Sequence, residues 1–315
     1  MKLKQKPKII VYSILAAALL VVAATILARF CFGYDVFDRS GWRHAEDGTY
    51  RYLDYHGAPL LGWQEINGST YYFLPESGIM ATGWLEMEEG RFFLRENGLK
   101  TTDWTELEGE RYYFHEDGKL AIGKVMIDGT AHYFTSAGKP FLLVNQWNPV
   151  PEDYVPELVV FEDFHVDASC RDDLAAMVAV CRAAGYPCDI TSAYRGVAYQ
   201  TTIFQRKVNR LVAAGYTEAA ARAETSRSIA IPGTSEHHLG LAVDIKSGQP
   251  TYGWLAKNSW KYGFNFRYPD GTTALTGIYY EPWHYRYVGK ELAAELYELD
   301  LCVEAYLEML TEQAS

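Results

Sequence analysis

The chain reads Ser-Glu-His-His-Leu-Gly-Leu-Ala-Val-Asp at residues 235–244 and Glu-Pro-Trp-His at residues 281–284. These two stretches supply two imidazoles and a carboxylate, from His237, His284 and Asp244. Two histidines and one carboxylate are a common ligand set for a catalytic zinc ion, which keeps one coordination position for water. The sequence therefore predicts a site for one Zn²⁺ ion that supports hydrolytic chemistry.

The spacing of the ligands is compatible with a single site, although His237 and Asp244 stand seven positions apart. Gly240 permits a tight turn after His237, and the chain then alternates as a strand that carries Asp244 on one face. Glu281, three residues before His284, is placed to take a proton from water at the metal. A lone His-x6-Asp arises often by chance, but buried acids and imidazoles need partners, and a metal supplies one.

The pattern Ser-x-His-x-x-Gly-x-Ala-x-Asp followed by Glu-x-x-His resembles that of the VanY-type D-alanyl-D-alanine carboxypeptidases of bacterial cell walls. The resemblance covers roughly residues 145–290 and includes Ser-Ala-Tyr-Arg at 192–195, Gln200 and the stretch 227–234. It implies zinc ligands at His237, Asp244 and His284 and a catalytic base at Glu281.

The resemblance also implies roles for residues around the metal. Arg195 would stabilise the developing oxyanion or the peptide carbonyl, and the alternative is a surface ion pair. Ser192 and Gln200 either contact the substrate or hold a loop in place. The residues expected to contact the substrate are Ser192, Tyr194, Gln200, Ser235 and Trp283. His238 is not expected to be a ligand, because adjacent side chains on a strand point to opposite faces.

The resemblance implies hydrolysis of the C-terminal D-alanine from a peptidoglycan stem peptide. Zinc would lower the pKa of bound water, Glu281 would accept the proton and return it to the leaving amine, and zinc with Arg195 would stabilise the oxyanion. Relatives with the same motifs also act as L,D-carboxypeptidases on tetrapeptide stems, so this activity is one alternative. A non-catalytic wall-binding protein is another, and the intact ligand set argues against it.

Residues 145–312 form the expected catalytic domain. The pattern predicts helices at 168–184, 197–214, from 217, at 252–262 and at 290–310, with strands near 188–191, 264–268 and 285–288. This mixed order with few parallel crossovers favours an α+β fold, with a small antiparallel sheet flanked by helices. The resemblance implies the same fold.

Residues 34–143 carry an array of five repeats. The units begin at Gly41, Gly62, Gly83, Asp103 and Gly123, and each contains an aromatic cluster and a closing glycine. Alternating aromatic residues between glycine turns predict short hairpins. One hairpin cannot bury its apolar face alone, so consecutive units are expected to stack into an all-β array.

The units resemble the choline-binding and glucan-binding repeats of Gram-positive cell surfaces. Aromatic rings attract a quaternary ammonium through cation–π interactions, so choline is one candidate ligand and a cell-wall glycan is another. The candidate ligand residues are Trp42, Trp63, Trp84 and Trp104. The alternative is that the rings only pack the array. Lys124, which stands in the place of a fifth tryptophan, would repel a cation.

The N-terminus predicts a membrane anchor. Residues 1–8 form a basic tail with four lysines, and residues 9–28 contain no charged side chain. A helix of that length spans about 30 Å, enough for the hydrocarbon core. The lysines favour a single-pass anchor with its N-terminus inside and the catalytic domain extracytoplasmic at the cell wall. A cleaved signal peptide is the alternative.

Composition narrows the class of partner. The formal net charge of −11 over 315 residues argues against nucleic acid or an anionic membrane surface as an electrostatic partner. The length predicts two domains together with attached segments.

The five cysteines lack Cys-x-x-Cys spacing, which argues against a thiolate metal site. The sequence leaves open whether these cysteines form a disulfide or remain free buried thiols.

Overall fold

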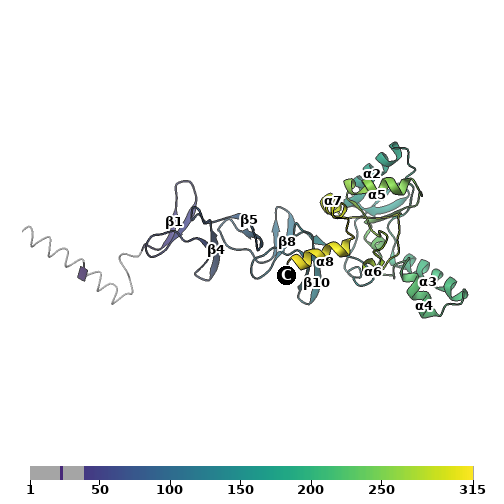
Figure 1. Ribbon diagram of the computed structural model, residues 1–315, viewed down its shortest axis with the longest axis horizontal. Helices are drawn as coiled ribbons and strands as arrows, with labels where there is room; N and C mark the ends of the chain where they lie inside the picture. The colour runs from purple at the N-terminus through teal and green to yellow at the C-terminus, as the bar shows by residue number, and fades with distance from the viewer. Residues whose placement is uncertain (1–21, 24–38, 315) are drawn as a thin grey trace, which may run out of the picture. The chain divides into compact units, whose positions relative to one another are not determined.

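The computed structural model describes residues 22–23 and 39–314 (Figure 1). The predicted anchor, 9–28, lies outside these residues apart from Val22 and Ala23. Within the described ranges no helix has the length and apolarity needed to cross a bilayer. The chain divides into two compact units, an N-terminal unit that includes residues 39–105 and 113–120 and a C-terminal unit of 106–112 and 121 onward.

The N-terminal unit is built from antiparallel hairpins, which confirms the repeat prediction. The hairpins are β1 (Gly41–His44) with β2 (Tyr50–Leu53), β3 (Gly62–Ile66) with β4 (Ser69–Phe73), and β5 (Gly83–Met87) with β6 (Gly90–Leu94). A fourth pair, β7 (Asp103–Leu107) with β8 (Glu110–Phe114), follows. The turn after β3 shows why the hairpins form. Asn67 and Gly68 both have positive φ, 53° and 76°, as a two-residue type I′ turn requires.

Successive hairpins stack through their aromatic side chains. The Trp63 ring lies 5.0 Å from Tyr72 on its own hairpin and 5.0 Å from Phe92 on the next. Between repeats, the backbone N–H of Met80 donates to the carbonyl of Tyr50 at 2.8 Å. The apolar face that one hairpin exposes is therefore covered by its neighbour, as expected for a repeat array.

The fifth hairpin packs within the C-terminal unit. Its strands β9 (Gly123–Ile127) and β10 (Thr130–Phe134) form a three-stranded sheet with β11 (Pro140–Phe141) and lie against helix α8 (Val303–Gln313). The Lys124 N–H donates to Thr311 Oγ1 at 2.8 Å. A Cβ at Gly123 would lie 2.5 Å from the Thr311 nitrogen, so only glycine fits here. Where earlier units carry tryptophan, this unit contacts a helix instead.

A four-stranded antiparallel sheet lies at the centre of the C-terminal unit. Its order is β14 (Ile190–Ser192), β15 (Ala242–Ile245), β17 (His284–Tyr287) and β16 (Phe264–Phe266). A separate hairpin, β12 (Leu158–Phe161) with β13 (Phe164–Asp167), precedes it along the chain. The predicted α+β class with a small antiparallel sheet is confirmed.

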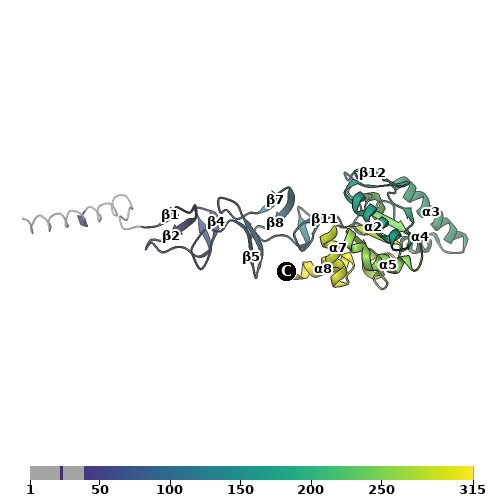
Figure 2. The same ribbon diagram turned by 90° about the horizontal axis from the view of Figure 1, so that it is seen from above.

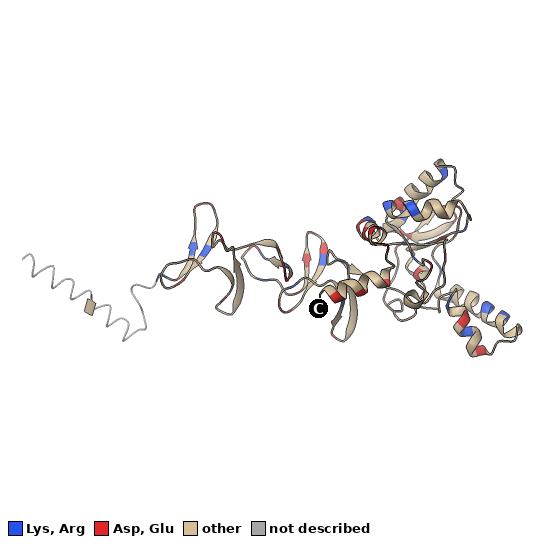
Figure 3. Cartoon of the chain, viewed as in Figure 1, with Lys and Arg blue, Asp and Glu red and all other residues tan. Residues whose placement is uncertain are grey.

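Helices flank this sheet. Buried side chains of helix α2 (Arg171–Ala183) pack on β14, β15 and β17, and Leu255 of α5 (Thr251–Asn258) joins the same core. Helices α3 (Val197–Ala213) and α4 (Glu218–Ser226) pair through Phe204, Val208 and Ala221. Both views show this pair projecting away from the rest of the unit (Figures 1 and 2). Charges of both signs are interspersed over these helices (Figure 3).

The predicted helix at 290–310 is wrong in one respect, because it consists of two helices. Helix α7 spans Lys290–Leu299, and α8 begins at Val303. Asp300 ends α7 in the left-handed conformation, with φ 52°. The apolar spacing is helical on both sides of the break, so periodicity alone does not reveal the turn. A second correction concerns 252–262, where α5 ends at Asn258 and a 3₁₀ turn, η3 (Ser259–Tyr262), follows.

Candidate active site

The three predicted metal ligands lie together. Asp244 on β15 and His284 on β17 face each other directly in the antiparallel register. The Oδ1 atom of Asp244 lies 3.1 Å from His284 Nδ1 and 3.4 Å from His237 Nε2. Ligand atoms of all three residues lie within 4.8 Å of one another, and all three side chains are buried. One ion can therefore contact all of them.

A short 3₁₀ helix, η2 (Glu236–Leu239), and the turn after it deliver His237 to the sheet. Gly240 ends η2 in the left-handed conformation, with φ 71°, and strand β15 follows. The reason given for excluding His238 as a ligand is wrong, because this residue lies on a 3₁₀ turn and not on a strand. Its Nδ1 donates to the Arg195 carbonyl at 2.5 Å, and its Nε2 accepts from the Gly233 N–H at 3.2 Å.

Substitution of Gly240 by alanine is expected to destabilise the fold by about 2 kcal/mol or more, because it adds left-handed strain to a steric clash. A Cβ there would lie 2.9 Å from the Asp167 nitrogen. Gly233→Ala is the matched control, since Gly233 also has positive φ, 89°, but open space around it. Urea denaturation midpoints measure both. Equal losses from the two variants would show that the clash contributes nothing.

The two histidine rings are oriented so that each can offer a lone pair to the same ion. His237 Nδ1 donates to the Ala193 carbonyl at 2.7 Å, which leaves Nε2 as the acceptor. His284 Nε2 faces a carboxylate oxygen of Glu236 at 3.4 Å, which leaves Nδ1 toward Asp244. His237 Nε2 is buried and has no hydrogen-bond partner among the described residues. Buried polar atoms are normally paired, so this donor set fits zinc.

The protonation states of His237 and Asp244 agree with that assignment. Burial lowers the pKa of His237 to about 4, which leaves its ring neutral. Burial alone would raise the pKa of Asp244, but His237 and His284 hold it well below its usual range. Burial would lower the pKa of His284, yet hydrogen bonds with Asp244 and Glu236 raise it to about 9. A zinc ion held by His284 would displace a proton from this ring.

Glu281, the predicted general base, lies beside the predicted metal ligands. Its Oε2 is 3.8 Å from His284 Nδ1, and its side chain is 12% exposed. Burial raises the pKa of this carboxyl to about 7. A group with a pKa near the working pH is best suited to accept a proton and return it.

Arg195 approaches the same place from the segment after β14. Its Nη2 lies 3.4 Å from Asp244 Oδ2, and its Nη1 donates to Gln200 Oε1 at 3.1 Å. Gln200 is buried and donates its own amide to the Ala230 carbonyl at 2.7 Å. The surface ion pair considered for Arg195 is wrong, because the guanidinium is largely buried, and Gln200 holds it in place.

A cavity of about 210 Å³ connects these groups. The predicted residues that line it are Arg195, Ser235, His237, Asp244, Glu281, Trp283 and His284. Three predicted substrate residues, Ser192, Tyr194 and Gln200, are not part of the lining. Ser192 instead pairs with Asp244 across the sheet, in the register of β14 and β15.

Sequence analysis missed several residues of the cavity and its support. Tyr268 lines the cavity, and its ring lies 4.8 Å from that of His284. Lys246 also lines it and directly follows the end of β15 at Ile245. Glu236, next to His237, is 2% exposed. A buried acid beside a predicted ligand is a usable signal only once its burial is known.

A second cavity, of about 460 Å³, lies in the repeats. It is lined by Trp42, Tyr50, Tyr71, Met80, Glu96 and Asn97. The Trp42 and Tyr71 rings lie 5.0 Å apart. Of the four predicted tryptophans, only Trp42 lines this cavity. The ring of Trp84 has the Arg91 guanidinium 4.6 Å from its centroid, and Trp63 is packed between Tyr72 and Phe92.

Comparison with known families agrees with this geometry. Residues 163–290 match the family model described as VanY, D-alanyl-D-alanine carboxypeptidase. The matched segment contains all three predicted metal ligands and Glu281. The chain carries a VanY domain. Residues 60–98, which hold the hairpins β3–β4 and β5–β6, match the choline-binding repeat.

Two curated relatives of the VanY domain are described as carboxypeptidases, one of them as putative. The chain is 43% identical over 173 residues to a D-alanyl-D-alanine carboxypeptidase of Enterococcus faecalis, with 53% of this chain and 65% of the relative covered. It is 32% identical to the putative carboxypeptidase YodJ of Bacillus subtilis, with 53% of this chain and 66% of the relative covered. The chain thus spans just under two thirds of the length of these relatives.

Solved structures show the same domain. VanYB in complex with D-alanine-D-alanine is 42% identical, with a TM-score of 0.51, and the match covers 53% of this chain and 96% of that one. A mutant of the vancomycin resistance D,D-pentapeptidase VanY in complex with Zn(II) is also 42% identical, with a TM-score of 0.51, over 52% of this chain and 97% of that one. The zinc in that relative agrees with the donor set of this VanY domain.

Proposed function

We propose that this chain is a zinc-dependent D-alanyl-D-alanine carboxypeptidase that removes the terminal D-alanine from peptidoglycan stem peptides. The observation that carries the proposal is the meeting of His237, Asp244 and His284 with Glu281 in one cavity. Relatives described as D-alanyl-D-alanine carboxypeptidases support the choice of substrate. The cavity is smaller than drug-sized ligand pockets, ~300–1,000 Å³, which suits a small terminal residue.

His237, Asp244 and His284 would hold the zinc, which when bound supplies a Lewis acid and an activated water. Glu281 accepts the proton of the attacking water and delivers it to the leaving amine. Arg195, fixed by Gln200 and Asp244, donates to the developing oxyanion of the peptide carbonyl. The indole of Trp283 and the ring of Tyr268 wall the cavity and restrict water.

The zinc-loaded full chain, incubated with pentapeptide and tetrapeptide stems and followed by mass spectrometry, tests this proposal. Loss of one alanine from the pentapeptide is expected. Cleavage of the tetrapeptide alone would assign an L,D-carboxypeptidase instead. If both peptides stayed intact although zinc was bound, the chain would be a non-catalytic wall-binding protein.

The repeats are proposed to bind the cell wall through a quaternary ammonium group such as choline. Three aromatic rings and the Met80 thioether surround the cavity at Trp42, and Glu96 adds a carboxylate. Rings around a cation contribute ~0.5–2 kcal/mol each, and the nearby negative charge adds to the attraction.

Trp42→Ala is expected to weaken retention on choline-bearing walls about tenfold, because it removes one ring of the cavity. Trp84→Ala is the matched control, since Arg91 already lies over that ring, and retention should change little. Sedimentation with isolated walls, with and without millimolar choline, measures both. Retention that choline leaves unchanged would indicate a glycan ligand, as would equal effects of the two variants.

We propose that residues 9–28 anchor the chain in the cell membrane and that the two described units are extracytoplasmic. The support is the uncharged run behind four lysines. Protease added to cells stripped of their wall should digest both units. Protection of the units, or a mature N-terminus near residue 29, would contradict the anchor.

A further inference from the structure

We infer that helix α8, which lies outside the matched segment 163–290, positions the zinc ligand His284 through a buried relay of charged side chains. The relay runs from His284 to Glu236, from Glu236 to Arg267, and from Arg267 to Glu304 on α8. These are positioning residues, because none of the last three lines the active-site cavity.

The first link joins Glu236 to the metal ligand. Glu236 Oε2 lies 3.4 Å from His284 Nε2, and neither atom has another hydrogen-bond partner within residues 22–23 and 39–314. The remaining nitrogen of the ring, Nδ1, is thereby turned toward Asp244. A carboxylate behind a ligating imidazole fixes the tautomer and orientation of the ring, and its removal commonly costs ~10–100-fold in metal affinity.

The second link fixes Glu236 itself. Its Oε1 accepts from Arg267 Nε at 2.8 Å and from Arg286 Nη1 at 3.2 Å. Arg286 reaches back with Nη2 to the Leu142 carbonyl at 3.3 Å. Glu236 is 2% exposed, and Arg267 and Arg286 are 0% and 2% exposed. Positions of buried charges are set by their partners and not by solvent.

The third link is a two-pronged contact with α8. Arg267 Nη1 and Nη2 donate to the two carboxylate oxygens of Glu304 at 2.8 and 2.7 Å. Such parallel bonds fix the plane of the guanidinium as well as its position. The carboxylates of Glu236 and Glu304 balance the guanidiniums of Arg267 and Arg286. Removal of the Glu304 charge therefore leaves an excess positive charge beside Glu236.

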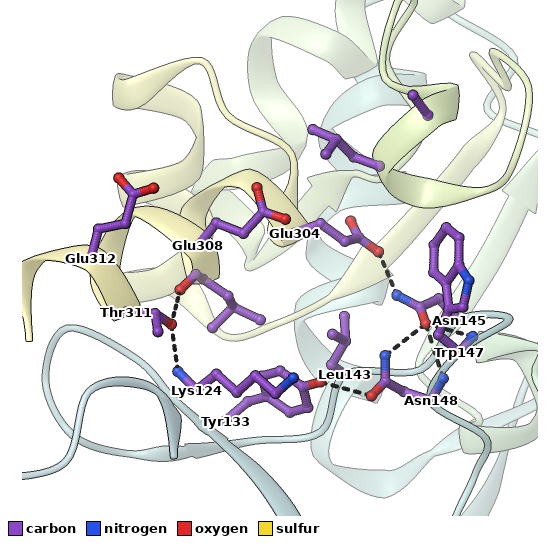
Figure 4. Close-up of a pocket in the computed structure, with 13 residues that line it drawn as sticks. Lys124, Tyr133, Leu143, Asn145, Trp147, Asn148, Glu304, Glu308, Thr311 and Glu312 are labelled. Atoms are coloured by element: carbon purple, nitrogen blue, oxygen red, sulfur yellow. Dashed lines mark hydrogen bonds between the residues drawn. The ribbon is translucent and has the colours of Figure 1, made fainter. Parts of the chain in front are cut away.

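Hydrogen bonds with residues outside the four-stranded sheet hold the Glu304 carboxylate in place. Its Oε1 accepts from Asn145 Nδ2 at 2.9 Å, and Asn145 Oδ1 accepts from Asn148 Nδ2 at 2.8 Å (Figure 4). Asn148 Oδ1 accepts from the Tyr133 hydroxyl of β10 at 2.7 Å. Figure 4 shows these side chains linked in turn, from Glu304 on α8 through Asn145 and Asn148 to Tyr133, and all four line a cavity beside α8. The fifth hairpin and α8 therefore support the metal centre together.

Glu304→Gln in the full chain tests the relay. The amide keeps the shape of the side chain but loses the negative charge. Its NH₂ group replaces one carboxylate oxygen and therefore faces an N–H donor of Arg267. Zinc affinity, measured by competition with a chelator, is expected to fall about tenfold. Glu308→Gln, one turn further on the exposed face of α8, should change it less than twofold.

A second control separates positioning from general stability. Leu310 is 3% exposed on α8 and packs in the apolar cluster away from the relay. Leu310→Ala should lower Tm while the folded protein keeps its zinc affinity within twofold. A loss of affinity equal to that of Glu304→Gln would mean that α8 acts through stability alone, and the relay would be overturned.

The double variant Arg267→Met with Glu304→Leu keeps the test open if Glu304→Gln does not fold. It removes a buried pair together, which proteins often tolerate, and leaves Glu236 with Arg286 alone. Weaker zinc binding is expected, and unchanged affinity in either folded variant would overturn the relay. The inference rests on the zinc site and not on the proposed substrate, so a protein that binds zinc without cleaving stem peptides would still allow this test.

Discussion

Glu281→Gln is expected to retain zinc and to lose ~10²–10⁴-fold in kcat on stem peptides, the range of a general-base contribution. The amide preserves the shape of the side chain but cannot accept a proton from water. The Glu281 carboxylate lies 3.8 Å from His284 Nδ1, beyond hydrogen-bond distance, so the metal site should persist without its charge. Steady-state kinetics and zinc content by elemental analysis measure the two quantities.

The control for that experiment is a carboxylate of the same type that stands outside the active-site cavity. Glu308→Gln removes a charge from the exposed face of α8 and should leave kcat unchanged. A Glu281→Gln enzyme within about threefold of the parent would show that another group takes the proton, since a general base contributes far more. Loss of zinc from that variant would instead assign Glu281 to the metal site.

Removal of zinc is expected to abolish hydrolysis. The His284→Ala variant should stay inactive even when zinc is added. A metal that stabilises transition-state charge contributes several kcal/mol, which corresponds to at least ~10³-fold in rate. His284 supplies one of the three ligands and faces Asp244 directly across β15 and β17. Its loss leaves two ligands and a cavity that water can enter.

Chelation followed by zinc addition distinguishes metal loss from unfolding. The parent enzyme should regain activity with one equivalent of zinc, whereas His284→Ala should stay inactive and bind less than one equivalent. His165→Ala, which removes an exposed imidazole on β13, is the matched control and should behave as the parent. Full activity in metal-free protein would contradict the zinc site.

The sequence by itself predicted the candidate metal ligands, the candidate base and the repeat array. Residues 235–244 contain a turn and a strand, so local geometry brings His237 and Asp244 close together. The period of the aromatic and glycine residues likewise sets each hairpin, because such turns depend on two adjacent residues. Both patterns involve residues close together in the sequence, so they can be recognised without a structure.

Tertiary structure decided which residues support that site and which rings line a cavity. Arg267, Glu304 and Asn145 stand far apart in sequence, and their charges and amides acquire partners only when α8 packs beside the sheet. Trp42 and Trp84 occupy equivalent places in their repeats, but Arg91 covers the second ring, whereas the first lines a cavity. Burial and long-range pairing arise from the packing of distant segments, and no local pattern encodes them.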